Sequence, residues 1–323
     1  MTQPPRHLVI ASRGSRLALQ QAEIVARLLR EAHPALGIDI TPVATSGDRD
    51  RRPFRAIAGK GLFVAEVERE VAEGRADLAV HSAKDLTSEL APGCEIACIP
   101  SRASVEDAVV GGEGSNGEER LASLAPDARL GTSSMRRRAL VTESRPDLEV
   151  VELRGNLDTR LAKVAQGELV AAIVAAAGLE RLGHGDIAAA GRLDPERWVP
   201  APAQGALAIE AREERHDLGA LLSPLRDERA TAEVLCERAF SAHLEGGCSV
   251  PLGCRARSEE ARLVVTGFLG EPEGGNSLRD RISGPADQAV ALGRELAAAL
   301  LSSGGDALLE EARATAAPAP SPP

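Results

Sequence analysis

The chain has 323 residues, of which 43% are hydrophobic and 27% charged, as in soluble globular proteins with more than one domain. A formal net charge of −10 and only 2% aromatic residues argue against a nucleic-acid partner, which needs phosphate neutralisation and stacking platforms. The N-terminus lacks the pattern of a signal peptide and no apolar run could cross a bilayer, so we expect a cytoplasmic protein without a membrane partner.

The cysteines and histidines indicate neither a metal site nor a disulfide framework. The five cysteines are odd in number and form no C-x-x-C pair, and the six histidines show no H-x-x-x-H spacing. We therefore expect no metal, and free thiols in a reducing compartment.

Strands alternate with helices along the first two hundred residues, which predicts an α/β fold. Helical spacing of apolar residues follows several of the strands, first at 17–31. Between the strands, residues 46–61 form a basic stretch without periodicity, either a linker or an active-site lid, and 111–120 form a polar surface loop. The expected strands are 7–11, 38–44, 77–80, 94–99, 105–110, a short one near Leu130, 148–153, 169–175 and 205–211.

Hydroxyl and basic residues gather where expected strands end, at 12–16, 81–85 and 131–138. Ligands of open α/β sheets bind beside the carboxyl ends of strands, and a helix start offers free N–H groups to an anion. The arginines at 136–138 oppose the helix macrodipole, so we expect them to face bound carboxylates or phosphates. The alternative reading is that Ser15 only caps a helix and that the arginines are solvated charges.

The last hundred residues have a different pattern. A long helix starts at Asp227, three segments (254–257, 262–269 and 277–282) suggest a small antiparallel sheet, and a helix at 286–301 should cover it. The sequence thus predicts three domains and a tail: 1–103 with 204–224, 104–203, 225–313, and a disordered segment at 314–323.

Cys248 lies on a loop after the helix that starts at Asp227. Two glycines precede it and Pro251 follows, which suits a tight turn that cannot continue as helix. A free cysteine is usually a small buried hydrophobe, but a thiol on an accessible loop can become a thiolate that forms a covalent bond. The residues alone leave both interpretations open.

Taken together, the motifs resemble one family, hydroxymethylbilane synthase, also called porphobilinogen deaminase. The matching stretches follow one another over most of the chain: IASRGSRLALQQA, AGKGLF, AVHSAKDL, GTSSMRRR, LRGNLDTRL, AGLERLG, AQGALAIEAR and ERAFSAHLEGGCSVPLG. The resemblance implies two periplasmic-binding-protein-like α/β lobes joined by two hinge segments, and a smaller α+β C-terminal domain with an antiparallel sheet.

The resemblance also implies an activity in tetrapyrrole, and thus heme, biosynthesis. In that family a transferase joins four porphobilinogen molecules head to tail, with loss of ammonia, on a dipyrromethane cofactor held by a thioether to the loop cysteine, here Cys248. Hydrolysis then releases the linear hydroxymethylbilane. Each pyrrole carries an acetate and a propionate, so the growing chain needs a site dense in guanidinium groups.

Matched position by position, the resemblance makes Asp85 the catalytic carboxylate. It assigns to the cofactor Cys248, Ser82, Lys84, Thr132, Ser134, Arg136, Arg137 and Arg160. It assigns to the substrate Arg13, Ser15, Gln21, Lys60, Arg154 and Arg181. We expect porphobilinogen as the small-molecule partner and a monomeric enzyme.

Two residues depart from the family pattern: Ala56 replaces a frequent lysine, and Ala203 replaces a frequent glycine, which could crowd the backbone near the cofactor. A two-lobed anion-binding protein without catalysis is the alternative function, since such lobes host many functions. That alternative gives no reason for a third domain with an accessible cysteine.

Overall fold

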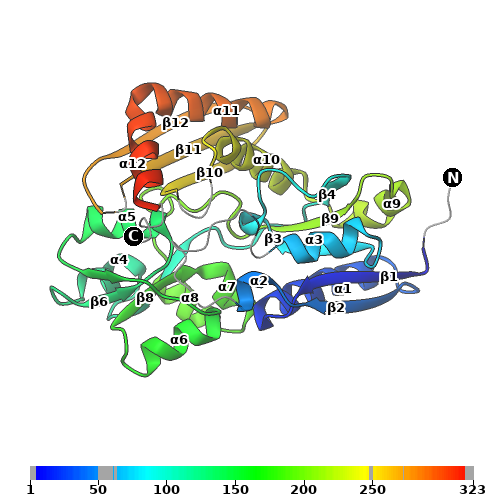
Figure 1. Cartoon of the computed structure of the whole chain (residues 1–323), viewed down its shortest axis with the longest axis horizontal. Coiled ribbons are helices and arrows are strands. Elements are labelled where there is room, and N and C mark those ends of the chain that lie inside the picture. The colour runs from blue at the N-terminus through cyan, green and yellow to red at the C-terminus, as the bar shows by residue number, and fades with distance from the viewer. Residues whose placement is uncertain (1–4, 50–60, 62–63, 247–249, 272, 317–323) are drawn as a thin grey trace, which may run out of the picture. The chain divides into compact units, whose positions relative to one another are not determined.

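The computed structural model describes residues 5–49, 61, 64–246, 250–271 and 273–316 (Figure 1). They form two compact units. Unit 1 comprises the described residues within 1–51, 59–103 and 205–234, and unit 2 comprises those within 104–204 and 235–323. Within the described ranges, no helix is long and apolar enough to span a membrane.

Unit 1 is built on a five-stranded mixed sheet in the order β2-β1-β3-β9-β4. Strands β2 and β3 pair with β1 in parallel, whereas β9 runs antiparallel to its two neighbours, β3 and β4. The strands are β1 (His7–Arg13), β2 (Gly37–Val43), β3 (Leu78–Ser82), β4 (Cys94–Cys98) and β9 (Leu207–Arg212).

Helices pack on this sheet through buried apolar residues that recur at helical spacing. In α1 (Arg16–Ala32), Ala22, Val25 and Leu29 are buried in a core shared with β1, β3 and β9. In α3 (Ala65–Ala72), the buried valines pack into a second cluster with residues of β1, β3 and β4. Short helical turns complete the unit: α2 (Ser46–Arg49), η2 (Ala83–Asp85), η3 (His216–Leu218), α9 (Gly219–Leu222) and η4 (Ser223–Leu225).

Unit 2 contains a four-stranded mixed sheet in the order β5-β8-β6-β7. Its strands are β5 (Asp107–Gly111), β6 (Arg129–Gly131), β7 (Glu149–Val151) and β8 (Ala171–Ala175). Its helices are α4 (Gly117–Ala122), α5 (Met135–Ser144), α6 (Leu157–Ala165), α7 (Ala176–Arg181) and α8 (Gly185–Gly191).

The remainder of unit 2 is a separate antiparallel sheet, β10 (Leu252–Glu259), β11 (Arg262–Gly270) and β12 (Ser277–Pro285). Helix α11 (Ala289–Leu300) lies along this sheet (Figure 1). Its Gly293 allows close approach to α10 (Glu228–His243), since an added Cβ would lie 2.1 Å from the Cys236 carbonyl oxygen. The predicted sheet and covering helix are confirmed, as is the α/β class with a separate antiparallel sheet.

Some local predictions were wrong. The polar loop expected at 111–120 contains the start of α4, whose N-cap Asn116 accepts a hydrogen bond from the Glu119 N–H. Helix α8 was not predicted, because its Gly- and Ala-rich sequence has no apolar periodicity. Helix α12 (Asp306–Ala316), which follows a helical turn at Leu301–Gly305, extends into the segment expected to be disordered; 317–323 lie outside the described residues.

The turn between β10 and β11 is strained at one residue. Glu260 is exposed and has φ +54°, a left-handed conformation that costs a non-glycine residue about 1 kcal/mol. We expect Glu260→Gly to raise the free energy of unfolding by about 0.5 kcal/mol, measured by urea denaturation.

The neighbouring Ala261 is the matched control, since it is also exposed but is not among the described residues with positive φ. Ala261→Gly should lower the free energy of unfolding, because glycine only adds freedom to the unfolded chain there. Equal effects at both positions would contradict the assignment of strain to Glu260.

Candidate functional site

A small cleft at the carboxyl ends of β1 and β3 brings together four predicted site residues in unit 1. Arg13, Gln21, Ser82 and Asp85 line it, together with Ala18, Val64, Val80 and His81. The position agrees with the general rule for open α/β sheets, in which ligands bind where strands end. A guanidinium, an amide, a hydroxyl and a carboxylate therefore face one space.

Hydrogen bonds fix the polar groups of this cleft. The amide of Gln21, which is 3% exposed, contacts the Ser82 hydroxyl, with Nε2 at 2.9 Å and Oε1 at 3.1 Å from Oγ. Ser15 is the N-cap of α1 and accepts a hydrogen bond from the Ala18 N–H at 3.3 Å. Asp85 ends the short turn η2 and is exposed, while Lys84 beside it is half-buried. The predicted capping role of Ser15 is thus present, and it leaves the hydroxyl proton available to a ligand.

A buried histidine–glutamate pair next to the cleft was missed by the sequence analysis. His81 Nε2 lies 2.8 Å from Glu210 Oε2, and the side chains are 3% and 0% exposed. The pair links β3, the central strand, to its neighbour β9, so it anchors the segment that carries Ser82 and Asp85. A signal was present in the sequence: a charged residue inside the apolar run LAIEA needs a buried partner.

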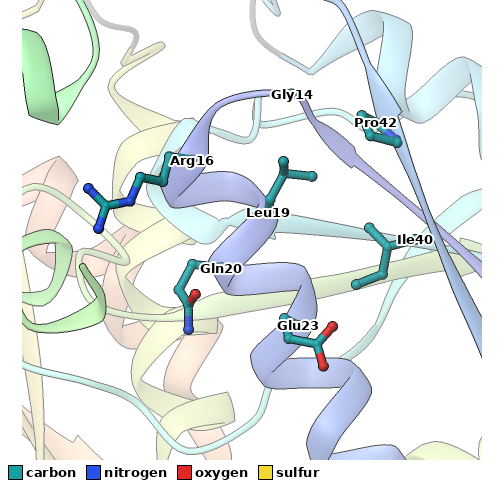
Figure 2. Close-up of a pocket in the computed structure, with 7 residues that line it drawn as sticks. All are labelled: Gly14, Arg16, Leu19, Gln20, Glu23, Ile40 and Pro42. Atoms are coloured by element: carbon teal, nitrogen blue, oxygen red, sulfur yellow. The ribbon is translucent and has the colours of Figure 1, made fainter. Parts of the chain in front are cut away.

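A larger hollow of unit 1, about 590 Å³, lies between α1 and β2 (Figure 2). None of the predicted site residues lines it. Like the cleft, it is lined by one guanidinium and one carboxylate, here Arg16 and Glu23, so only the predicted site residues distinguish the cleft. The lining residues of the hollow are Gly14, Arg16, Leu19, Gln20, Glu23, Ile40 and Pro42.

In unit 2 the predicted turn between β6 and α5 is confirmed. The backbone N–H of Thr132 donates to the Val151 carbonyl at 3.0 Å, which extends the pairing beyond β6. Ser134 is the N-cap of α5; its hydroxyl accepts from the Arg137 N–H at 3.4 Å, and its own N–H donates to Thr132 Oγ1 at 3.2 Å. The hydroxyl groups therefore organise the first turn of α5, where an anion would meet free N–H groups.

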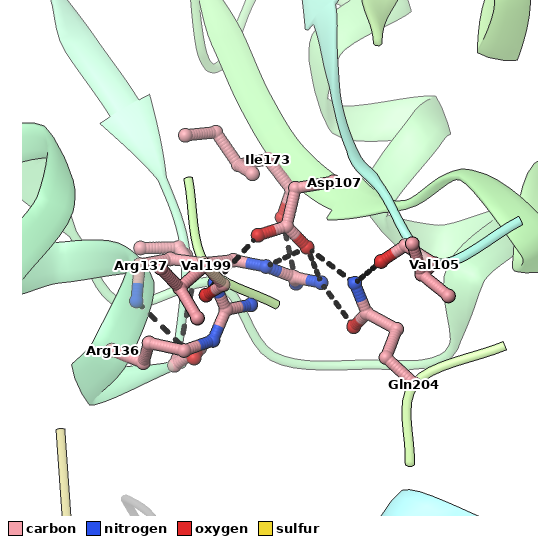
Figure 3. Close-up of polar contacts among 9 residues, drawn as sticks. Val105, Asp107, Arg136, Arg137, Ile173, Val199 and Gln204 are labelled. Atoms are coloured by element: carbon pink, nitrogen blue, oxygen red, sulfur yellow. Dashed lines mark hydrogen bonds and ion pairs between the residues drawn. The ribbon is translucent and has the colours of Figure 1, made fainter. Parts of the chain in front are cut away.

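Arg136 and Arg137, on this first turn, are buried with exposed fractions of 2% and 5%. Both contact Asp107, which is completely buried (Figure 3). Burial alone would raise the pKa of Asp107, but the two guanidinium charges hold it well below its usual range. The carboxylate facing these arginines in the structure is thus an internal one, and ligand contact by either arginine stays a prediction.

The other predicted arginines of unit 2 are half-buried. Arg160 on α6 donates through Nε to the Gly155 carbonyl at 2.9 Å, and Arg154 lies just before that turn. Arg181 ends α7, and burial lowers its pKa to about 10, so it still carries its charge at neutral pH. The ligand-binding roles of these residues stay predictions.

Lys60 and Cys248 lie outside the described residues. The other four cysteines are free and buried. Burial raises the pKa of Cys94 to about 12, of Cys98 to about 11 and of Cys236 to about 12, so these thiols are poor nucleophiles at neutral pH. Across the part of the chain that the structure describes, no cluster of metal-ligating side chains occurs.

Ala203, which replaces a frequent glycine of the family, has a strained backbone. Ala203 is 1% exposed and has φ +61°, the left-handed region that glycine adopts without strain. Its N–H donates to Glu237 Oε2 at 2.6 Å, a bond that holds this backbone in place. The strain is thus local and offset by a charge-assisted hydrogen bond.

Comparison with known proteins identifies two matching sequence families. "Porphobilinogen deaminase, dipyromethane cofactor binding domain" matches residues 8–220, and "Porphobilinogen deaminase, C-terminal domain" matches residues 231–302. Among curated relatives, porphobilinogen deaminase of Paraburkholderia phytofirmans is 45% identical over 98% of this chain and 92% of its own. That of Roseiflexus sp. is 44% identical over 94% of this chain and 98% of its own.

Similar solved structures include substrate-binding proteins. The second substrate-binding domain of Lactococcus lactis GlnP has a TM-score of 0.43 and 12% identity, covering 73% of this chain and 95% of that one. The methionine-binding protein MetQ has a TM-score of 0.40 and 9% identity, covering 70% and 93%.

The buried His81–Glu210 pair predicts a large difference between two carboxylate-to-amide substitutions. Glu210→Gln removes the charge-assisted bond and buries an amide with unpaired donors, so the free energy of unfolding should fall by about 2 kcal/mol. Asp39→Asn makes the same change in the exposed pair with His7 and should cost less than about 1 kcal/mol. Chemical denaturation measures both, and similar losses would show that burial of the pair contributes nothing.

Proposed function

The chain belongs to the porphobilinogen deaminase family, and from this we propose how its own residues carry out the family's reaction. The reaction is that of a hydroxymethylbilane synthase, which condenses four porphobilinogen molecules head to tail with loss of ammonia and releases the linear tetrapyrrole by hydrolysis. The observation that supports our residue assignment best is the cleft in which Arg13, Gln21, Ser82 and Asp85 meet.

The residues present fit a dipyrromethane cofactor, which carries several carboxylates. The first turn of α5 combines two hydroxyls, a helix start and two buried guanidinium groups that share a single carboxylate. When bound, the cofactor supplies the pyrrole position to which the first substrate is joined. We propose that Cys248 holds it and that its acidic arms are bound by Ser82, Lys84, Thr132, Ser134, Arg136, Arg137 and Arg160.

Substrate binding requires a second set of cations, because every porphobilinogen brings two carboxylates. A guanidinium group binds a carboxylate with two parallel hydrogen bonds, which fixes orientation as well as charge. Arg13 and Gln21 already face the cleft beside Asp85. We assign to the substrate Arg13, Ser15, Gln21, Lys60, Arg154 and Arg181.

Asp85 is the proposed catalytic carboxylate. It is the acidic side chain among the residues that line the cleft, and it is exposed at the end of η2. A fixed negative charge there stabilises the positive charge that develops on the substrate pyrrole as ammonia leaves. An alkylamine has a pKa near ~10 and arrives protonated, so the reaction needs charge stabilisation at this point more than a strong acid.

We also propose that the enzyme is a cytoplasmic monomer with three domains at the boundaries given above. The buried free thiols support a reducing compartment. The alternative, a two-lobed binding protein without catalysis, is not favoured, because the family matches cover both the cofactor-binding domain and the C-terminal domain.

Intact-protein mass spectrometry tests the covalent part of this proposal. The purified chain should carry a mass excess equal to one dipyrromethane, and Cys248→Ser should abolish it. Cys254→Ser is the matched control and should retain the excess, because that thiol is buried. A wild-type mass equal to that of the bare chain would support the non-catalytic alternative.

Replacement of Asp85 tests the catalytic assignment. Asp85→Asn keeps the shape of the side chain but removes its charge, so kcat should fall by at least about 100-fold while KM changes little. The control Glu89→Gln makes the same charge change at an exposed position of the following loop and should retain wild-type kcat. Turnover of Asp85→Asn near the wild-type rate would show that the role is wrong.

A further inference from the structure

Asp107 is the centre of a buried polar network in unit 2 (Figure 3). It begins β5 and is 0% exposed. Its Oδ1 accepts hydrogen bonds from Arg137 Nε at 3.0 Å, Arg137 Nη2 at 2.7 Å and Gln204 Nε2 at 2.9 Å. Its Oδ2 forms an ion pair with Arg136 Nη1 at 2.8 Å.

Arg137 uses almost all of its donors inside the protein. Besides the two bonds to Asp107, Nη1 donates to the Ile173 carbonyl on β8 at 3.1 Å, and Nη2 donates to Gln204 Oε1 at 3.3 Å. Gln204 in turn donates to the Val105 carbonyl at 2.8 Å. A guanidinium has five N–H donors, so four of those on Arg137 already have acceptors. Arg137 therefore joins α5, β5, β8 and the segment that returns at Gln204.

Arg136 is bound differently. Its Nη1 contacts Asp107 and donates to the Val199 carbonyl at 2.8 Å. Its Nε is buried without a hydrogen-bond partner among the described residues. Burial lowers the pKa of Arg136, and the nearby charge of Arg137 lowers it further, so the contact with Asp107 compensates the charge incompletely.

The two arginines carry more positive charge than Asp107 can neutralise. Two buried guanidinium groups share one carboxylate, which leaves one positive charge uncompensated at the first turn of α5. The positive end of the helix dipole lies at the same place. A net charge in a buried group destabilises the protein, and a ligand carboxylate would neutralise it.

We propose that Asp107 divides the two arginines between different tasks: it holds Arg137 as an internal clamp, and it leaves Arg136 as the guanidinium that a carboxylate of the dipyrromethane neutralises. Arg137 thereby leaves the set of cofactor ligands proposed above: Asp107 and Arg137 are positioning residues, and Arg136 alone of the pair meets the ligand. The inference rests on the proposed function, within which it separates two neighbouring residues that the family resemblance treats alike.

The test has two measurements. One is the thermal unfolding midpoint of protein that lacks the cofactor, and the other is the fraction of chains that carry the cofactor. Arg136→Gln and Arg137→Gln are each made in two backgrounds, Cys248→Ser, which cannot form the thioether, and the native Cys248. In the Cys248→Ser background, Arg137→Gln should lower the unfolding midpoint by about 5 °C or more, because it leaves Asp107 and Gln204 without their partner. Arg136→Gln should leave the midpoint unchanged or raise it, since it removes the uncompensated charge.

In the native Cys248 background, Arg136→Gln should lower the fraction of chains with the dipyrromethane mass excess at least tenfold, although the protein is folded. An equal drop of the midpoint for both variants without cofactor would overturn the proposal. So would an Arg137→Gln variant of unchanged midpoint that carries no mass excess, because Arg137 would then be a direct ligand.

If Arg137→Gln does not fold, Arg137→Lys keeps a positive charge beside Asp107 but lacks the planar guanidinium. It should fold and keep a measurable fraction of loaded chains; a folded Arg137→Lys variant with no mass excess would overturn the proposal. Failure of the proposed function can be told apart from failure of this inference. If the proposed function is wrong, the wild-type protein carries no mass excess. The midpoints of the Cys248→Ser series still test the role of Arg137 in that case.

Discussion

One buried carboxylate facing two guanidinium groups is the constraint on which unit 2 depends. Asp107 can stay ionised in a fully buried position only because Arg136 and Arg137 lie within hydrogen-bond distance. The arginines in turn fix where α5 begins relative to β5 and β8. The contact that organises the fold is therefore the same one that leaves a positive charge near the proposed cofactor site, so stability and ligand affinity are set by one group of side chains.

Both units place their polar chemistry by the same local device. A buried strand ends, a short turn supplies a hydroxyl group, and a helix begins with one of its first N–H groups bonded to that hydroxyl; this occurs after β1 with Ser15 and after β6 with Ser134. Arginines on or beside these turns add charge. Of 38 basic residues only Lys60, Lys84 and Lys163 are lysines, and guanidinium groups suit the planar carboxylates of pyrroles better than ammonium groups do.

Local features could be predicted from the sequence, and long-range partners could not. The turn at 131–138 and the antiparallel sheet follow from residues adjacent in the chain, and both are confirmed. Asp107 gave no signal, because its role depends on Arg137, which lies 30 residues further along the chain. Glu210 stood out only as a charge in an apolar strand, and its partner His81 lies 129 residues away. Short helices such as α4 were missed because six residues carry too little periodicity.

The position of β9 has a consequence for synthesis of the chain. It lies between β3 and β4, so the sheet of unit 1 has a gap until residues 207–212 leave the ribosome. The β5-β8-β6-β7 sheet needs only residues 107–175 and can close earlier. At about 5–20 residues per second, β3 and β4 wait roughly 6 to 26 s with unpaired edges after their own translation. Protection of nascent chains from aggregation is therefore needed most for the segment made first, whose sheet is completed later than the β5-β8-β6-β7 sheet that follows it in the chain.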